Sequence, residues 1–177
     1  MIITVYNEVI PNVVVEGQRK VFEKFGEKII QIKPKVWGGH AHTVDEYLKN
    51  NNWDHAIVFD IDCIPLNRNV IKDAREWALD NIGLYSVAQN PNHIQNAPDY
   101  ASPAFIAFSR KTYEELGNPS FQGSKLMYPS HVEIPKWKFA DGSMFGIGTT
   151  YENKIYHHFE GRRITKSFED KCNQILS

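Results

Sequence analysis

Two carboxylates stand one residue apart in the segment 57–66, "IVFDIDCIPL", directly after an apolar run. The run predicts a fully buried parallel strand, and ligands collect at the carboxyl ends of such strands. With the period-2 geometry of a strand, Asp60 and Asp62 would point the same way, and their like charges would need a cation to neutralise them. Oxygen donors favour Mg²⁺ or Mn²⁺, ions that complete their coordination with substrate phosphates. Alternatively, both aspartates cap the turn before Pro65.

Strands and helices alternate through the first half of the chain, which predicts an α/β fold with a mainly parallel sheet. Strands are expected at 2–5, 28–32, 55–66, 83–88, 103–109 and 154–159. Helices are expected at 12–25, 42–51, 69–80, 110–117 and 141–154. Gln18 is placed on the polar side of the first helix, and Thr43 with Glu46 forms a capping box that should begin the second.

Length and composition indicate one domain, spanning residues 1–177, with 42% hydrophobic and 23% charged residues. A formal net charge of -1 gives no electrostatic case for broad nucleic-acid binding. No segment resembles a signal peptide or a membrane span. Cys63 and Cys172 do not form a pairing motif, which favours free thiols and a cytoplasmic protein.

Several segments, in order, resemble the GT-A-fold nucleotide-sugar glycosyltransferases, in particular glycogenin-like and bacterial galactosyltransferase-like enzymes. The similar segments are "ITVYNE", "IVFDIDCIPL", "ASPAFIAFSRKTYEEL", "DGSMFG" and "YHHFEGRR". The resemblance implies a three-layer, Rossmann-like sandwich. It also implies transfer of a sugar from a nucleoside diphosphate donor, expected to be a UDP-sugar, with Mn²⁺ or Mg²⁺. The acceptor is unknown, with a glycan as one candidate.

The same resemblance assigns the metal ligands. Asp62 would bind the metal directly, and Asp60 would hold the metal or the ribose. His158 would be the third ligand, since imidazole suits Mn²⁺ beside carboxylates. His157 is its rival, because adjacent strand residues face opposite sides and only one of the two can reach the site.

The donor's other contacts follow from the resemblance as well. Tyr6 and Asn7 would hold the uracil or the ribose. Arg162, Arg163 or Lys166 would assist the metal at the diphosphate oxygens. For each of the basic residues the alternative is a solvated surface near the end of the chain.

Asp141 is the expected catalytic residue. As a base that activates an acceptor hydroxyl it would imply inversion at the anomeric carbon. The glycogenin-like tail implies retention instead, with Asp141 holding the sugar. A third reading is a helix N-cap.

Competing hypotheses remain. A haloacid-dehalogenase-like phosphatase would use Asp60 as nucleophile, and a non-catalytic GT-A domain would bind nucleotide or glycan without turnover. His40, His42 and His93 offer a weak zinc pattern. The tryptophans are mostly core candidates, with Trp137 as a possible sugar platform; they are Trp37, Trp53, Trp77 and Trp137.

Overall fold

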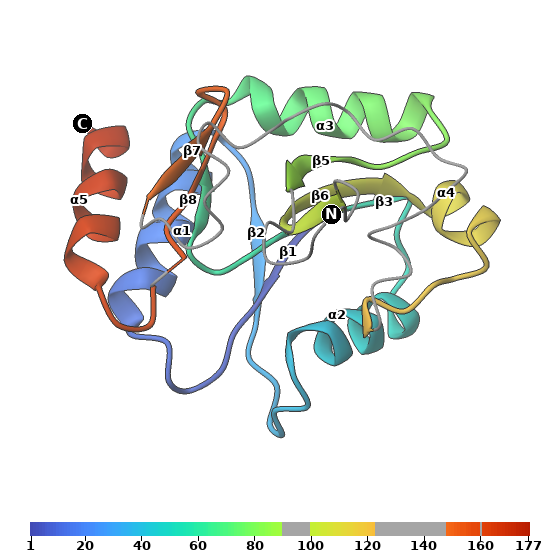
Figure 1. The fold of residues 1–177 in the computed structure, drawn as a ribbon, viewed down its shortest axis with the longest axis horizontal. Helices are drawn as coiled ribbons and strands as arrows, with labels where there is room; N and C mark the ends of the chain where they lie inside the picture. The colour runs from blue at the N-terminus through green and yellow to red at the C-terminus, as the bar shows by residue number, and fades with distance from the viewer. Residues whose placement is uncertain (90–99, 123–147, 160) are drawn as a thin grey trace, which may run out of the picture.

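A mainly parallel sheet lies at the centre of the fold (Figure 1). The computed structural model describes residues 1–89, 100–122, 148–159 and 161–177. Within these ranges the sheet has five strands in the order β2-β1-β3-β6-β5. They are β1 (Ile2–Val5), β2 (Ile29–Ile32), β3 (His55–Phe59), β5 (Tyr85–Gln89) and β6 (Tyr100–Ser109). β1 pairs in parallel with β2 and β3, whereas β6 runs antiparallel to β3 and β5. The expected sheet is confirmed, with β6 as its reversed strand.

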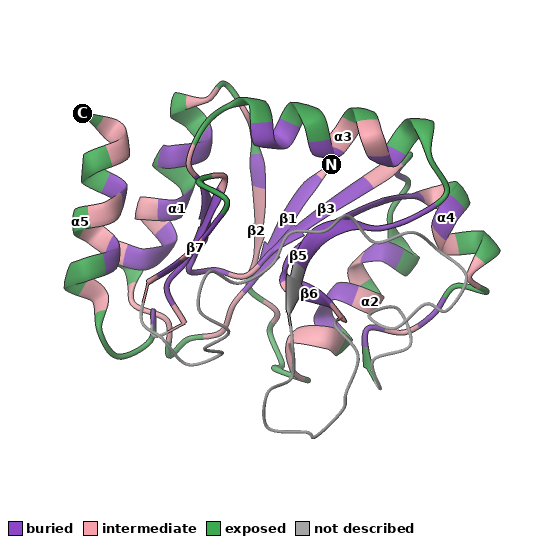
Figure 2. Ribbon diagram, turned by 45° about the horizontal axis from the view of Figure 1, so that its top comes forward, coloured by how far each residue is buried: buried purple, intermediate pink, exposed green. Residues whose placement is uncertain are grey.

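Helices cover both faces of this sheet (Figures 1 and 2). They are α1 (Asn12–Lys24), α2 (His40–Asn50), α3 (Asn69–Asp80), α4 (Arg110–Glu115) and α5 (Thr165–Leu176). Apolar residues of α1 and α3 share a core with one face of the sheet, and those of α2 and α4 share a core with the other. α5 packs on α1 and not on the sheet. The predicted three-layer α/β sandwich is therefore confirmed.

Aromatic rings fill the core between the sheet and α1. Phe59, the last residue of β3, is fully buried. Its ring centroid lies 5.0 Å from that of Phe22, edge to face, and 4.8 Å from that of Phe105. Such pairs stabilise a core beyond the area that they bury. Phe59 therefore anchors the strand immediately before the two aspartates.

A smaller sheet lies beside the central one. Among the described residues it has three strands in the order β4-β8-β7. They are β4 (Cys63–Pro65), β7 (Thr149–Tyr151) and β8 (Ile155–His157), all paired antiparallel. Ile64 and Tyr156 bury one face of this sheet against α1 and α5. The second sheet joins a segment from the first half of the chain to one near its end.

The structure corrects several local expectations. The expected strand 55–66 is divided, because a turn at 60–62 separates β3 from β4. The expected helix 141–154 contains β7, and its first seven residues lie outside the described ranges. α2 begins at His40, and the Thr43 hydroxyl donates to the Gly39 carbonyl at 2.9 Å inside the first turn, so the capping box is not its start. α5 was not expected.

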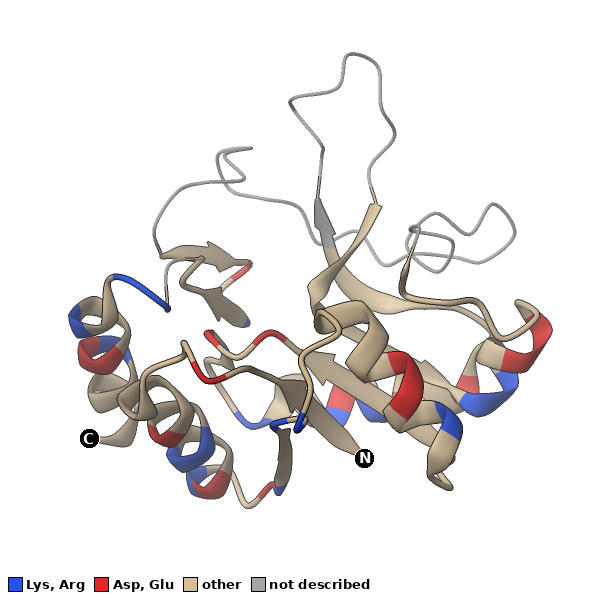
Figure 3. Ribbon diagram, turned by 90° about the horizontal axis from the view of Figure 1, so that it is seen from below, with Lys and Arg blue, Asp and Glu red and all other residues tan. Residues whose placement is uncertain are grey.

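Charge is spread over the helices. Acidic and basic residues alternate along α1 and α5 (Figure 3). Several form pairs along one helix, such as Lys166 with Asp170 in α5. Exposed pairs of this kind contribute little to stability. In the part of the chain that the structure describes, no helix is long and apolar enough to cross a membrane.

Replacing Phe59 tests the packing described above. Phe59→Ala should lower the free energy of unfolding by about 3–5 kcal/mol, because it leaves a cavity between Phe22 and Phe105. Urea unfolding measures this change. Leu79→Ala is the control, since Leu79 is 50% exposed on α3 and its loss should cost less than about 0.5 kcal/mol. Equal effects of the two changes would contradict the packing.

Candidate functional site

Asp60 and Asp62 lie in the turn between β3 and β4, where the chain passes from the central sheet to the smaller one. The Cys63 N–H closes this turn by donating to the Asp60 carbonyl at 3.0 Å. The Asp60 N–H donates to the Ala104 carbonyl of β6 at 3.1 Å. The pair therefore sits at the carboxyl end of a central strand, in the place that the apolar run before it predicted.

One imidazole bridges the two carboxylates. Nε2 of His157 lies 3.4 Å from Oδ2 of Asp60 and 3.3 Å from Oδ1 of Asp62. The ring is almost fully buried, and Phe159 covers it at a centroid distance of 3.8 Å. Phe159 has a φ of 67°, a conformation that is rare for a bulky residue. Both carboxylates thus face the same buried nitrogen, Nε2 of His157.

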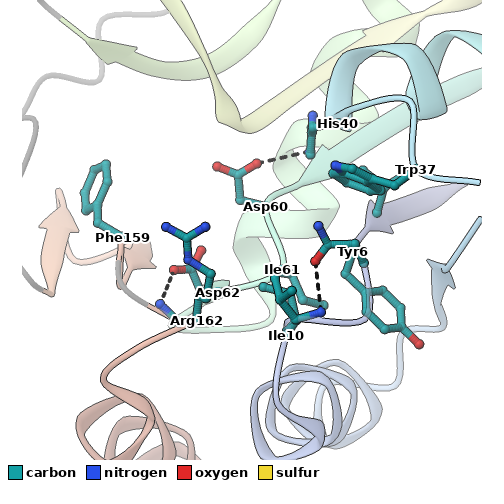
Figure 4. A pocket seen from close by; sticks show the side chains of 13 residues that line it. Tyr6, Ile10, Trp37, His40, Asp60, Ile61, Asp62, Phe159 and Arg162 are labelled. Carbon is teal, nitrogen blue, oxygen red and sulfur yellow. Dashed lines mark hydrogen bonds and ion pairs between the residues drawn. The ribbon is translucent and has the colours of Figure 1, made fainter.

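A second imidazole contacts Asp60 from the other side. Nε2 of His40, the first residue of α2, lies 3.2 Å from Oδ1 of Asp60 (Figure 4). Burial raises the pKa of the Asp60 carboxyl, but the contact and charge of His40, together with the charge of His157, outweigh burial and hold this pKa below its ordinary value. Asp60 is therefore kept ionised between two imidazoles.

The segment after β8 closes over Asp62. The Gly161 N–H donates to Oδ2 of Asp62 at 2.9 Å, and the His158 N–H donates to the Asp62 carbonyl at 3.0 Å. A Cβ on residue 161 would lie 2.5 Å from the Cβ of Asp62, closer than real contacts allow. The approach therefore requires glycine at this position.

The structure places His157, and not His158, beside the carboxylates. His158 is fully buried on the opposite side of the strand. Its Nε2 donates to the Ile164 carbonyl at 2.5 Å, and its Nδ1 lies 3.0 Å from the Tyr156 hydroxyl. Both ring nitrogens are thus engaged. The expectation that only one of the two histidines reaches the site agrees with this geometry, but the preference for His158 does not.

A pocket of about 300 Å³ opens beside the carboxylates (Figure 4). Of the residues expected to hold the donor, those that line it are Tyr6, Asn7, Asp60, Asp62 and Arg162. Tyr6 and Asn7 follow β1, and Arg162 follows Gly161 on the closing segment. The pocket also contains Trp37, which is 38% exposed and was expected in the core.

Other expected residues lie elsewhere. Lys166 is on the exposed face of α5, where it pairs with Asp170, and it is not part of the pocket lining. Arg163 is exposed. Asp141, the expected catalytic residue, lies outside the described residues, as do Trp137 and His93.

The donor set suits a divalent cation of the Mn²⁺ type, which accepts both carboxylate oxygen and imidazole nitrogen. The gaps of 3.3 and 3.4 Å between His157 Nε2 and the carboxylate oxygens are near the ~3 Å that separates neighbouring ligands around an octahedral ion with bonds of about 2.1 Å. Within the described residues, no group of three or more His, Cys, Asp or Glu side chains is already arranged to hold a metal ion. The donors would have to turn toward a common point.

Sequence reasoning missed His40, Trp37 and Gly161 as parts of the site. A usable signal was present for the first two. Parallel strands have their carboxyl ends at one edge, so the segment after β2, "KPKVWGGHAH", had to lie near the segment after β3. The Gly161 contact depends on a close tertiary approach, for which the local sequence carries no signal.

Comparisons with known proteins identify the fold only. No protein-family model matches the chain, and no curated protein sequence matches it. A solved structure, A197 from STIV, is similar with a TM-score of 0.53 and 9% identity, over 89% of this chain and 93% of that one. At such identity the likeness shows the arrangement of elements and nothing about chemistry.

Two other solved structures are less similar. The mannosyltransferase PcManGT from Pyrobaculum calidifontis, in complex with GDP-Man and Mn²⁺, has a TM-score of 0.48 and 14% identity, over 66% of this chain. This chain covers 46% of that enzyme's length. A putative glucose-1-phosphate thymidylyltransferase from Bacillus anthracis has a TM-score of 0.39 and 14% identity, over 71% of this chain and 58% of that one.

Replacing Gly161 tests the closing contact. Gly161→Ala should lower the free energy of unfolding by about 1–3 kcal/mol, because the new methyl group collides with Asp62. Thermal or urea unfolding measures the effect. Arg162→Ala, an exposed neighbour, is the control and should change stability by less than about 0.5 kcal/mol. A Gly161→Ala protein as stable as the control would show that the segment does not close on Asp62.

Proposed function

We propose that the chain is a glycosyltransferase of the GT-A type, which takes a sugar from a nucleoside diphosphate donor, such as a UDP-sugar, with the help of Mn²⁺ or Mg²⁺. One observation carries this proposal: two carboxylates line a pocket at the carboxyl end of a central strand, and the buried imidazole of His157 lies within 3.4 Å of both. In α/β sheets this edge is where ligands bind.

Asp60, Asp62 and His157 would hold the cation. When bound, it would neutralise the charge that develops on the departing diphosphate. Contacts within the chain hold the carboxylates close together and in a defined orientation. The imidazoles of His40 and His157 offset their repulsion, and the Gly161 N–H fixes the orientation of Asp62.

The rest of the pocket supplies contacts for a nucleotide. Trp37 presents a partly exposed ring, which suits stacking on a base. Asn7 offers an amide group at the end of β1; its Oδ1 accepts from the Val9 N–H at 3.3 Å. Arg162 brings a guanidinium to the pocket, and guanidinium pairs well with diphosphate oxygens. A base, a ribose and a diphosphate would therefore each have a chemical partner in this pocket.

The stereochemistry of sugar transfer, inversion or retention at the anomeric carbon, is not assigned. Asp141 remains the proposed catalytic residue, as a base or as a contact to the sugar, and it lies outside the described residues. For the phosphatase alternative, Asp60 would have to attack a phosphate. Imidazole nitrogens contact both of its oxygens, which favours a binding role for this carboxylate.

Calorimetry tests the proposal directly. UDP should bind the protein in the presence of Mn²⁺ and bind at least tenfold more weakly when the metal is removed by chelation. Asp62→Asn should abolish the metal-dependent part, because it removes one charge from the ligand pair. Asp54→Asn, at an exposed residue directly before β3, is the matched control and should bind as the unaltered protein does.

The outcomes separate the competing functions. No heat with Mn²⁺ and any of UDP, GDP or dTDP would refute the proposal. Release of sugar from a screened nucleotide-sugar, or its transfer to added glycans, distinguishes an enzyme from a domain that only binds. Hydrolysis of simple phosphomonoesters would support the phosphatase instead.

The two histidines give a second test. His157→Gln should weaken Mn²⁺ binding at least tenfold, because it removes the nitrogen that faces both carboxylates. His158→Gln should leave Mn²⁺ affinity within about threefold but lower the free energy of unfolding by about 1–3 kcal/mol, because it disrupts a buried hydrogen-bond network. Titration calorimetry and urea unfolding on each variant provide the measurements. The opposite order would restore His158 as the ligand.

A further inference from the structure

Gln18 connects α1 to the turn that carries the aspartates. The sequence pattern placed this residue on the polar side of the helix, but its side chain is fully buried, among Val14, Val15, Val21 and Phe22 of the same helix. An amide in such surroundings is costly unless its hydrogen bonds are made. The position therefore calls for a specific partner.

The partners are the two ends of the turn. Nε2 of Gln18 donates to the Asp60 carbonyl at 2.8 Å and to the Cys63 carbonyl at 3.0 Å. The two hydrogens of one amide thus join the first and last residues of the segment Asp60–Cys63. The Cys63 N–H also donates to the Asp60 carbonyl, so this oxygen accepts from both.

Gln31 fixes the orientation of this amide. Its Nε2, on β2, donates to Oε1 of Gln18 at 3.2 Å and to the Val15 carbonyl at 2.8 Å. Because Oε1 accepts from Gln31, the amide nitrogen of Gln18 must face the two carbonyls, which can only accept. If the amide were reversed, Oε1 of Gln18 would face the two carbonyl oxygens of the turn, and its Nε2 would face Nε2 of Gln31. The network therefore has one orientation.

The bonds act on the backbone from which both carboxylates project. Asp60 and Asp62 repel each other, and a free turn would relax by separating them. A turn held at both of its ends cannot open without breaking two hydrogen bonds. The bond to Cys63 is buried, and the bond to Asp60 is partly buried, so their loss is costly. Gln18 itself does not line the pocket.

We propose that Gln18 is a positioning residue of the carboxylate site: its amide holds the Asp60–Cys63 turn in the shape that brings both carboxylates to the imidazole of His157. This inference rests on the proposed function for its metal-binding consequence. The effect of Gln18 on the conformation of the turn does not depend on the proposed function.

A matched pair of variants tests the role. Gln18→Met keeps the length of the side chain and removes its donors. Thr112→Val is the control: Thr112 is fully buried in α4, on the other face of the sheet, and its Oγ1 accepts from the Gly83 N–H at 3.1 Å. Both changes leave buried backbone groups without a side-chain partner, so both should lower the melting temperature.

Mn²⁺ binding, measured by electron paramagnetic resonance well below either melting temperature, separates the two variants. Gln18→Met should bind Mn²⁺ at least tenfold more weakly than the unaltered protein, whereas Thr112→Val should stay within twofold. A purely structural role for Gln18 predicts equal Mn²⁺ affinity in the two variants, and that result would overturn the proposal.

A second readout needs no metal. The Gly161 amide is bonded to Asp62, so its hydrogen exchange reports whether Asp62 keeps its place. The rate is divided by that of the β3 amides in the same sample, which removes the effect of global unfolding. This ratio should rise at least tenfold in Gln18→Met and stay within twofold in Thr112→Val. An unchanged ratio in Gln18→Met would overturn the proposal.

The two proposals can fail separately. If the unaltered protein binds no Mn²⁺, the proposed function fails, and the Gly161 exchange ratio still decides the role of Gln18. If Gln18→Met does not fold, Gln31→Met takes its place. Gln31 is only partly buried, and its replacement removes the donor that orients the amide of Gln18. In that variant the exchange ratio should rise at least threefold, and no change would refute the role.

Discussion

Asp60 and Asp62 carry like charges within a single turn, and the surrounding structure is organised to offset their repulsion. Each neighbour supplies a donor or a positive charge from a different part of the chain. His40 comes from α2, His157 from β8, and the Gly161 N–H from the segment that follows. Gln18 holds the backbone beneath them. The site is therefore a meeting point of four segments, and none of them could hold the pair alone.

The fold places these segments together through two sheets. The central sheet brings the ends of β1, β2 and β3 to one edge, which supplies Tyr6, Trp37 and Asp60. The smaller sheet pairs β4 with β8 and so sets His157 opposite Cys63, directly after the turn. The burial of Ile64 and Tyr156 against α1 and α5 stabilises that pairing. Packing of residues that do not line the pocket thus determines which imidazole faces the carboxylates.

Local patterns predicted the fold and the strand end before Asp60 well, because both depend on short-range periodicity. The buried run before Asp60 and the helix 69–80 are examples. The two carboxylates do face the same way, but a closed turn is responsible and not the alternation of a strand. The choice between His157 and His158 depended on which face of the smaller sheet packs against α1 and α5, which is a tertiary relation. The sequence pattern put Gln18 on the exposed side of α1 because a polar side chain is usually exposed, and the pattern carries no information on buried hydrogen-bond partners.

Pairing between β4 and β8 also bears on how the site forms. The hydrogen bond from Gly161 to Asp62 spans 99 residues. Contacts of such long range form slowly, since a large loop must close first. On a ribosome, the aspartates would emerge well before His157 and Gly161 are synthesised. The nascent chain would then present the aspartates without these two contacts until residues 157–161 are made. Assembly of the site would therefore wait until β8 and the segment after it are made.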